Sequence, residues 1–337
     1  MLYVTTRNEH DAFTALKPLG QGRGPQRGLF VPFQIPKASE EQIRQLKDKT
    51  FGACVADILN LFFNARLDAW DVDFCIGRYP TRCVALTHKV MIAEAWHNPD
   101  FDFTRMVRNL SSRIRGVEDT NGFSSNWAWI TVRIAALFGF FGELYRQNAV
   151  AYGQEVDISI PSGDFAGPMA AWYAKQMGLP IGNIICCCDE NDAAWELLKN
   201  GAIYPNAGMN IPSDLERLIF HSCGAEEVQR YANAMENSLP YVLSEDMLAR
   251  LRMGMECAVI SWERRSSIIS SVYRTNAYIM DPGSAMSYGG LQDYRSGCGT
   301  GRYTLILAER SPICSADTVS AALDISVQQL KERLNLA

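Results

Sequence analysis

The sequence predicts an α/β fold with a mostly parallel β-sheet and helices flanking it. From about residue 125 onward, short apolar runs alternate with amphipathic segments of helical length. Strands are expected over residues 156–160, 184–188 and 303–308, and helical segments separate them. This order is typical of right-handed crossovers that join parallel strands. The chain has 337 residues and is 47% hydrophobic, which is ample for the core of such a fold.

The first part of the chain is expected to pack on this sheet and to supply edge strands. Residues 28–32 form a short extended run, and Ser39 followed by Gln42 has the spacing of a capping box that begins a helix. Apolar residues at helical spacing predict a helix over 51–66. A further helix is expected over 104–114.

The remaining expected helices connect the strands and end the chain. They cover residues 125–147, 167–177, 192–200, 213–223, 226–236, 244–252, 262–273, 284–294, 316–323 and 326–335.

Ligands of open α/β sheets bind beyond the carboxyl ends of the strands. The turn Pro161-Ser162-Gly163-Asp164 follows an expected strand, so it is a natural binding position.

Charge and composition argue against several classes of protein. The net charge of −5 and the scattered arginines provide no basic surface for a polyanion, so nucleic-acid binding is not expected. The first residues lack the features of a secretory signal. The most apolar helix, over 127–145, contains Arg133 and Glu143, which favours a buried helix over a membrane span. We therefore expect a cytoplasmic protein that binds no membrane.

The ten cysteines are irregularly spaced, which favours reduced thiols over a disulfide framework. Cys186, Cys187 and Cys188 follow two isoleucines and are expected to form a buried strand. Adjacent side chains of a strand point to opposite faces, so these three thiols cannot converge on one metal ion. No metal site is expected.

Residues 92–108 read Ile-Ala-Glu-Ala-Trp-His-Asn-Pro-Asp-Phe-Asp-Phe-Thr-Arg-Met-Val-Arg. This stretch resembles the threonine synthase segment Glu-Leu-Trp-His-Gly-Pro-Thr-Leu-Ala-Phe-Lys-Asp, whose lysine holds pyridoxal phosphate (PLP) as a Schiff base. Thr104 stands at the position of that lysine. A hydroxyl cannot form an imine with an aldehyde, so the covalent chemistry of the family has no anchor here.

The resemblance to threonine synthases extends over most of the chain. It includes residues 3–7, 27–36, 158–167, 172–181, 189–192, 211–218 and 281–285. It implies a PLP fold type II architecture, like that of the tryptophan synthase β subunit. The family's small cofactor domain is expected to be truncated, because residues 115–120 lead from the lysine helix almost directly to Asn126-Trp127-Ala128-Trp129-Ile130. We therefore expect an N-terminal region over 1–115 and a large α/β domain over 116–337.

The resemblance also identifies the positions that would bind the cofactor. They are Ser162, Gly163, Asp164, Phe165, Ala166, Gly167 and Glu309. Small residues at a helix start could still offer amide groups to an anion. However, Asp164 replaces an asparagine of the family and would repel a phosphate, while Ala166 replaces a glycine. We expect these positions to be degenerate and no cofactor to be bound.

His97 and Asp102 are candidate pocket residues, although a hydrogen-bonded structural role is the favoured interpretation of His97. Together with Asp100 and Asp164 they could form an oxygen-rich cation site. Solvated loop carboxylates and a helix cap at Asp164 are the simpler interpretation. The nearest lysine before Thr104 is Lys89, which is expected to be solvated at a strand end.

These losses together predict a threonine synthase-like protein without PLP-dependent phosphohomoserine lyase activity. We therefore do not expect a PLP-dependent enzyme. Instead, the protein would bind a small amino-acid-like ligand or take part in another biosynthetic step. One alternative is an active lyase that uses a non-standard site. Another is a non-catalytic subunit, paired with an active paralogue or with itself, in which an apolar surface should replace the missing domain.

Overall fold

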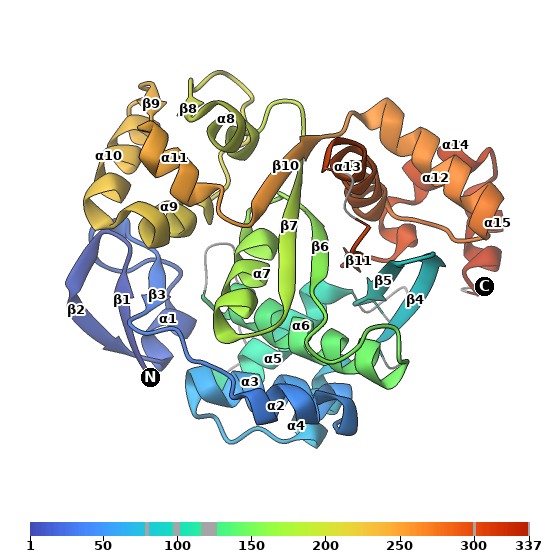
Figure 1. The fold of residues 1–337 in the computed structure, drawn as a ribbon, viewed down its shortest axis with the longest axis horizontal. Coiled ribbons are helices and arrows are strands. Elements are labelled where there is room, and N and C mark those ends of the chain that lie inside the picture. The colour runs from blue at the N-terminus through green and yellow to red at the C-terminus, as the bar shows by residue number, and fades with distance from the viewer. Residues whose placement is uncertain (78–80, 97–101, 116–126, 299–300, 336–337) are drawn as a thin grey trace.

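A computed structural model describes residues 1–77, 81–96, 102–115, 127–298 and 301–335 of the chain. A six-stranded sheet lies at its centre (Figure 1). The strands, in spatial order, are β10 (Met255–Val259), β7 (Ile181–Cys188), β6 (Val156–Pro161), β11 (Tyr303–Ala308), β5 (Val90–Glu94) and β4 (Arg82–Thr87). Neighbouring strands are parallel except β4, which runs antiparallel to β5 at the edge. The predicted mostly parallel α/β fold is therefore confirmed.

The three strands predicted individually are all present in the sheet. β11 covers the predicted residues, β6 is one residue longer, and β7 begins at Ile181 instead of Ile184. The sequence analysis did not identify β4, β5 or β10. These strands have five or six residues and carry charged side chains such as Arg82, Glu94 and Glu256, which weaken the apolar pattern of a strand.

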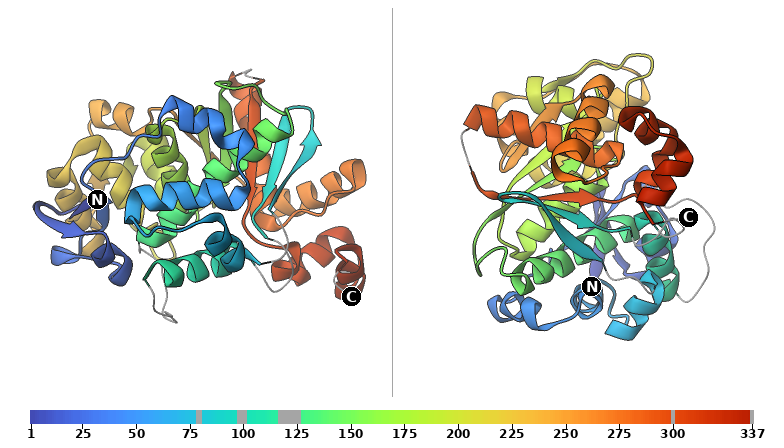
Figure 2. Two further views of the ribbon diagram at one scale, coloured as in Figure 1. Left: turned by 90° about the horizontal axis from the view of Figure 1, so that it is seen from below. Right: turned by 90° about the vertical axis from the view of Figure 1, so that its right-hand side faces the viewer.

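Helices cover both faces of the sheet. α6 (Trp127–Arg146) and α7 (Ala166–Met177) lie on one face, with α3 (Phe51–Phe63), α4 (Ala69–Ile76) and α5 (Phe103–Arg115) beyond them. On the other face α13 (Pro282–Cys298) packs against the sheet, and α12 (Trp262–Asn276), α14 (Ala316–Leu323) and α15 (Val327–Arg333) lie outside it. The right-hand view of Figure 2 shows the sheet nearly edge-on between the two layers.

The N-terminal residues form a separate small sheet. Its order is β2 (Asn8–Thr14), β1 (Leu2–Thr5) and β3 (Phe30–Pro32), and both pairings are antiparallel. It lies beside α9 (Leu215–Cys223) and α10 (Ala225–Glu236), as the blue and yellow elements of Figure 1 show. An ion pair between Arg7 and Glu216 joins the two parts of the chain.

The remaining elements are short. They are α1 (Leu16–Gly20), η1 (Pro25–Arg27), α2 (Glu40–Arg44), η2 (Gln45–Asp48), α8 (Ala193–Asn200), β8 (Ala202–Ile203), β9 (Tyr241–Val242), α11 (Glu245–Leu251) and η3 (Pro312–Ser315). The capping box predicted at Ser39 and Gln42 is present at the start of α2. α3 ends at Phe63, before the predicted Arg66, because Asn64 adopts the left-handed conformation with φ 51°.

α6 is long and apolar enough to cross a membrane by length and composition, yet it lies in the core. Of its most apolar 18-residue window, 89% is buried. The contacts of Arg133 and Trp129 on this helix contribute to the site described below. A buried helix, as predicted from its interrupting charges, is confirmed.

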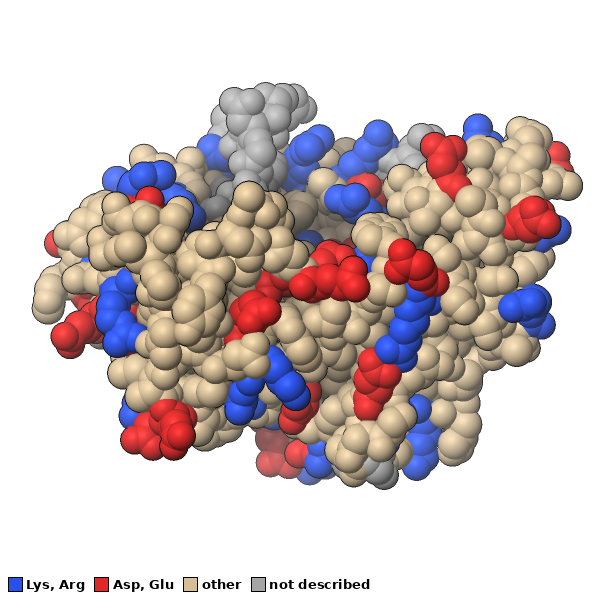
Figure 3. Space-filling view, turned by 90° about the horizontal axis from the view of Figure 1, so that it is seen from above, with Lys and Arg blue, Asp and Glu red and all other residues tan. Residues whose placement is uncertain are grey.

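The three consecutive cysteines lie on β7 as predicted, with alternate side chains on opposite faces. The Sγ atoms of Cys186 and Cys188 are 3.9 Å apart on one side, whereas Cys187 lies 3.6 Å from the Ser159 hydroxyl on the other. Within the described residues, no group of His, Cys, Asp and Glu has the arrangement of a metal site. Figure 3 shows acidic and basic side chains interspersed over one face of the molecule.

Two glycines of α13 provide a test of how tightly this helix packs on the sheet. A Cβ atom at Gly290 would overlap the buried Cys187 Sγ and lie 3.5 Å from the Ala258 Cβ, whereas nothing lies within 4 Å of a Cβ at Gly297. We expect Gly290→Ala to lower the free energy of unfolding by about 1–3 kcal/mol through overpacking. Gly297→Ala should raise it by about 0.5–1 kcal/mol, because alanine favours helix.

Urea unfolding of both variants, followed by circular dichroism, measures these changes. Equal stability of the two variants would show that α13 does not pack closely on β7.

Candidate functional site

A cavity of about 210 Å³ opens beyond the carboxyl ends of β6 and β11. Its lining residues are Trp129, Arg133, Ile160, Pro161, Ser162, Gly163, Asp164, Gly167, Glu309 and Arg310. The sequence analysis placed a binding position at this edge of the sheet. Five of the predicted positions line the cavity, whereas Phe165 and Ala166 are buried beneath it.

The turn between β6 and α7 has an unusual backbone. Gly163 has φ +49° and Phe165 has φ 68°, and the Phe165 amide donates to the Ser162 carbonyl over 2.6 Å. Phe165 itself is fully buried, so its packing offsets the cost of the left-handed conformation. At Gly167 a Cβ atom would meet the Ile160 side chain at 2.5 Å. The small residue therefore allows α7 to begin close to the end of β6.

The Asp164 carboxylate is bound by neighbouring groups of the protein. One oxygen accepts a hydrogen bond from the Ala166 amide at 3.0 Å, and the other accepts from the Trp129 indole at 2.9 Å. The Asp164 carbonyl accepts from the Asp214 amide at 3.1 Å. The N-cap position predicted for Asp164 is occupied by Phe165, and Asp164 binds the first amide of α7 from one residue further back. The other donor, Trp129, stands where the threonine synthase pattern that the sequence resembles has an arginine.

The second feature of the cavity is a bidentate ion pair between Arg133 and Glu309. The Arg133 Nε and Nη2 atoms each donate to one Glu309 oxygen at 2.8 Å. The guanidinium also lies over the Phe103 and Trp129 rings, at 5.0 and 4.4 Å from their centroids. Burial alone would lower the pKa of Arg133, but the Glu309 carboxylate outweighs it and raises this pKa above its ordinary value.

The start of α5 is attached to the same edge of the sheet. The Phe103 amide donates to the Glu309 carbonyl at 3.0 Å, and the half-buried Thr104 follows it. Thr104 is not among the lining residues of the cavity. Asp102, predicted as a pocket residue, is not among the lining residues of this cavity, and its carboxylate accepts from the Arg105 amide at 3.0 Å at the start of α5. His97 and Asp100 lie outside the described residues.

The candidate lysine Lys89 lies far from this cavity. It occupies the turn before β5, next to the amino end of that strand, with φ 62°. β5 and β11 are parallel, so their carboxyl ends meet at the opposite edge of the sheet. Among the described residues, no lysine lines the cavity at that edge.

The site does not fit PLP, the cofactor of the family that the sequence resembles. The Ser162 hydroxyl donates to Asp192 at 2.7 Å, and the Ala166 amide is occupied by Asp164. Two donors that a phosphate cradle would offer are thus satisfied internally. A phosphate dianion would also meet the Asp164 carboxylate at short range in a partly buried cavity, where charge repulsion is strong.

The sequence analysis named neither Arg133 nor Arg310 as a site residue. Arg133 had a signal, because it is an arginine within an otherwise apolar helix, and a buried charge is usually paired. Arg310 had none, because it follows a strand in a segment without a recognisable pattern. The lining contains these two arginines and the carboxylates of Asp164 and Glu309, so its formal charge is zero.

Comparison with families and curated proteins points to one group. Residues 2–78 match the family model for the threonine synthase N terminus. The human protein "Threonine synthase-like 1" is 26% identical over 215 residues, which is 56% of this chain but only 28% of that protein. Threonine synthase from Pseudomonas aeruginosa is 24% identical over 174 residues, covering 48% of this chain and 36% of the enzyme.

Solved structures extend the similarity of fold over the whole chain. PLP-bound threonine synthase from Brucella melitensis superposes with a TM-score of 0.85 at 20% identity, covering 97% of this chain and 92% of that one. Yeast threonine synthase gives a TM-score of 0.83 at 17% identity, covering 100% and 94% of the two chains. The fold is therefore that of the threonine synthases, a PLP fold type II architecture.

Restoring the lysine alone should not restore a PLP site. We expect Thr104→Lys, incubated with PLP, to develop no imine absorbance and to retain no cofactor after borohydride reduction. The reason is that Asp164 still occupies the amide at the start of α7 and Ser162 still binds Asp192. The double variant Thr104→Lys/Asp164→Asn removes the repelling charge and is the comparison. An imine band in the single variant would show that the cradle remains competent.

Proposed function

Since this chain is a threonine synthase-like protein with the PLP fold type II architecture, we propose that it acts without lysine-bound PLP. In this proposal the cavity beyond β6 and β11 binds a small amino-acid-like ligand. The observation that carries the proposal is the internal capping of the turn after β6, in which Asp164 binds the Ala166 amide and the Trp129 indole.

The charges of the cavity support a zwitterionic ligand. Arg133 and Glu309 neutralise each other through two hydrogen bonds, which leaves Asp164 and Arg310 as the groups available to a ligand. Each Asp164 oxygen has one donor in the described residues and can accept a further one from an ammonium group. The Arg310 guanidinium, which is exposed, can bind a carboxylate through two N–H groups.

The same arrangement argues against the lyase alternative. A PLP-dependent reaction needs the aldehyde to be held and its phosphate bound, and the described residues supply neither function at this edge of the sheet. A different reaction on a bound amino acid stays compatible with the cavity. We therefore propose a ligand-binding protein or a recruited enzyme of another class.

Binding of amino acids tests the proposal directly. We expect at least one amino acid in a panel of the standard amino acids and O-phosphohomoserine to bind, measured by saturation-transfer NMR and then by calorimetry. Asp164→Asn and Arg310→Gln should each weaken binding about 10-fold or more, since a hydrogen bond to a charged group contributes about 1.5–3 kcal/mol. Arg274→Gln, which removes an exposed arginine of α12, is the matched control.

The proposal fails if none of these ligands binds, or if the control variant weakens binding as much as the cavity variants. A parallel assay with saturating PLP and O-phosphohomoserine addresses the lyase alternative. We expect no threonine or phosphate to form. Turnover would establish an active lyase with a non-standard site.

A second candidate function, an interaction subunit, is favoured by an exposed aromatic pair on α4. Trp70 and Phe74 are 65% and 72% exposed and stack with ring centroids 5.4 Å apart. α4 packs against α5, the helix that carries Thr104. Large aromatic side chains side by side on a surface are typical of a contact with another protein. The partner would be a second copy of this chain or an active paralogue.

The aromatic pair gives a prediction about assembly. If the chain is an interaction subunit that pairs with itself, light scattering after gel filtration should give the mass of a dimer or larger assembly. Trp70→Ser/Phe74→Ser should then reduce it to the monomer mass of 37.6 kDa. Met253→Ser should leave the assembly intact, because the Met253 side chain is 76% exposed but does not belong to the aromatic pair. A monomeric wild-type chain would exclude self-association through α4.

We also propose a cytoplasmic location without nucleic-acid or membrane partners. Its support is the irregular spacing of the cysteines along the sequence and the interspersed surface charges visible in Figure 3.

A further inference from the structure

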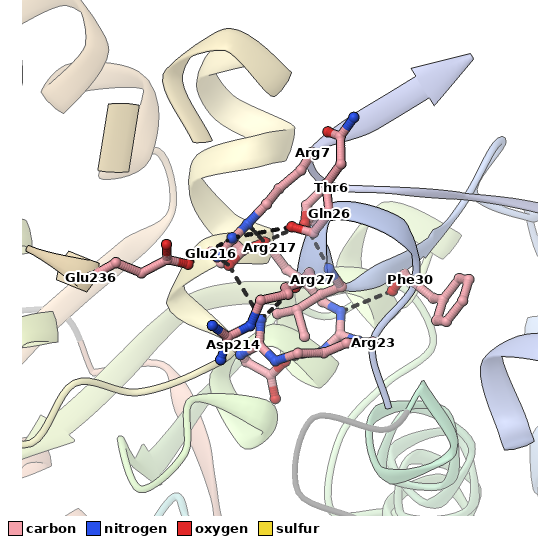
Figure 4. Close-up of polar contacts among 11 residues, drawn as sticks. Thr6, Arg7, Arg23, Gln26, Arg27, Phe30, Asp214, Glu216, Arg217 and Glu236 are labelled. Carbon is pink, nitrogen blue, oxygen red and sulfur yellow. Dashed lines mark hydrogen bonds and ion pairs between the residues drawn. The ribbon is translucent and has the colours of Figure 1, made fainter. Parts of the chain in front are cut away.

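A second cavity, of about 270 Å³, lies between the N-terminal sheet and helices α9 and α10. Arginines dominate its polar wall: Arg7 comes from the turn between β1 and β2, and Arg23 and Arg27 come from the segment around η1. Glu216 of α9 and Tyr231 of α10 face them across the cavity. Figure 4 shows the three arginines and Glu216 converging from the two parts of the chain.

One arginine of the three forms part of the framework. The Glu216 side chain is 4% exposed and accepts hydrogen bonds from the Thr6 hydroxyl and from Arg7. The Arg7 Nη2 and Nε atoms lie 3.0 and 3.3 Å from the two Glu216 oxygens, and its Nη1 atom lies 3.0 Å from Glu236. Two carboxylates therefore neutralise Arg7 and hold it in place.

The other two arginines retain charge that the protein does not neutralise closely. The Arg23 Nη1 atom donates to the Arg27 carbonyl at 2.7 Å and lies 3.7 Å from Glu216, which Arg7 already binds. The Arg27 side chain forms no ion pair or hydrogen bond in the described part of the chain. Arg23 and Arg27 can thus offer several N–H groups to a bound anion.

The backbone that carries Arg27 is strained. Gln26 and Arg27 have φ angles of 55° and 61°, and neither is glycine. A left-handed conformation costs about 1–2 kcal/mol for such residues and is often found at binding sites. Here the strained turn brings the Arg27 side chain to the wall of the cavity.

Tyr231 provides a further hydrogen-bond donor on the wall of the cavity. The residue is 4% exposed and lines the cavity, and its hydroxyl has no hydrogen-bond partner among the described residues. Burial raises the pKa of Tyr231, so the hydroxyl stays protonated. It can therefore donate a hydrogen bond to an acceptor bound in the cavity.

We propose that this cavity binds a small organic phosphate. Its phosphate oxygens would accept hydrogen bonds from Arg23, Arg27 and Tyr231, and its organic part would contact the apolar wall formed by Ile211, Pro212 and Met235.

Three donor side chains from two segments of the chain suit a tetrahedral group with three terminal oxygens better than a planar carboxylate with two. Arg7 and Glu216 orient the donors without binding the ligand. The site is separate from the amino-acid cavity beyond β6 and does not depend on the function proposed for it.

Calorimetry with glycerol 3-phosphate tests the proposal, because this compound has no ammonium group for the amino-acid cavity. Inorganic phosphate and glycerol are titrated beside it. We expect saturable binding of glycerol 3-phosphate, weaker binding of inorganic phosphate and none of glycerol. Arg27→Gln should weaken binding about 10-fold or more, and Tyr231→Phe several-fold, at physiological salt.

Arg66→Gln is the matched control, because Arg66 is also exposed and left-handed, with φ 56°. It should change the affinity less than about twofold, as should Asp164→Asn. Circular dichroism confirms that each variant is folded. The proposal is overturned if the wild-type chain shows no saturable binding up to about 10 mM glycerol 3-phosphate. It is also overturned if Arg66→Gln weakens binding as much as Arg27→Gln.

Discussion

A carboxylate of the protein occupies the start of α7, where an open α/β sheet offers amide groups to an anionic ligand. Asp164 accepts from the Ala166 amide and the Trp129 indole, and its carbonyl binds the Asp214 amide. The strand β6, the helix α6 and the segment before α9 therefore meet at one residue. Because the anion is built into the chain, the edge of the sheet is stable without a bound phosphate. The negative charge also sets which ligands the neighbouring cavity can accept.

The Arg133–Glu309 pair completes this edge. Its two partners are separated by 176 residues in the sequence and connect α6 to the end of β11, while the Phe103 amide adds α5 to the same place. Removing Glu309 would leave the buried Arg133 charge without its partner, which costs about 3–5 kcal/mol. The pair also explains how Trp129 is tolerated, because the Arg133 guanidinium stacks on its ring. The residues that depart from the family pattern thus bind one another.

Much of the fold could be predicted from local patterns. The strands β6, β7 and β11 are apolar and buried, and the capping box at Ser39 is a local signal. The position of the turn after β6 also predicted the edge of the sheet at which the site lies. In contrast, β10 alternates weakly and β4 has exposed residues, so only pairing with neighbours identifies them. The partners of Arg133 and the role of Asp102 as a cap could not be predicted, since both depend on contacts in three dimensions.

The retained and the altered parts of the chain serve different physical functions. The match to the threonine synthase N terminus covers residues 2–78, which include Arg7 and its contact with Glu216 of α9. This contact fixes the small sheet on the large domain and does not involve the edge of the sheet where a cofactor would bind. It can therefore persist after the lysine position becomes Thr104. The segment 211–216 borders the arginine-lined cavity and also binds Asp164 through the Asp214 amide. The same short segment therefore borders one cavity and is hydrogen-bonded to a lining residue of the other.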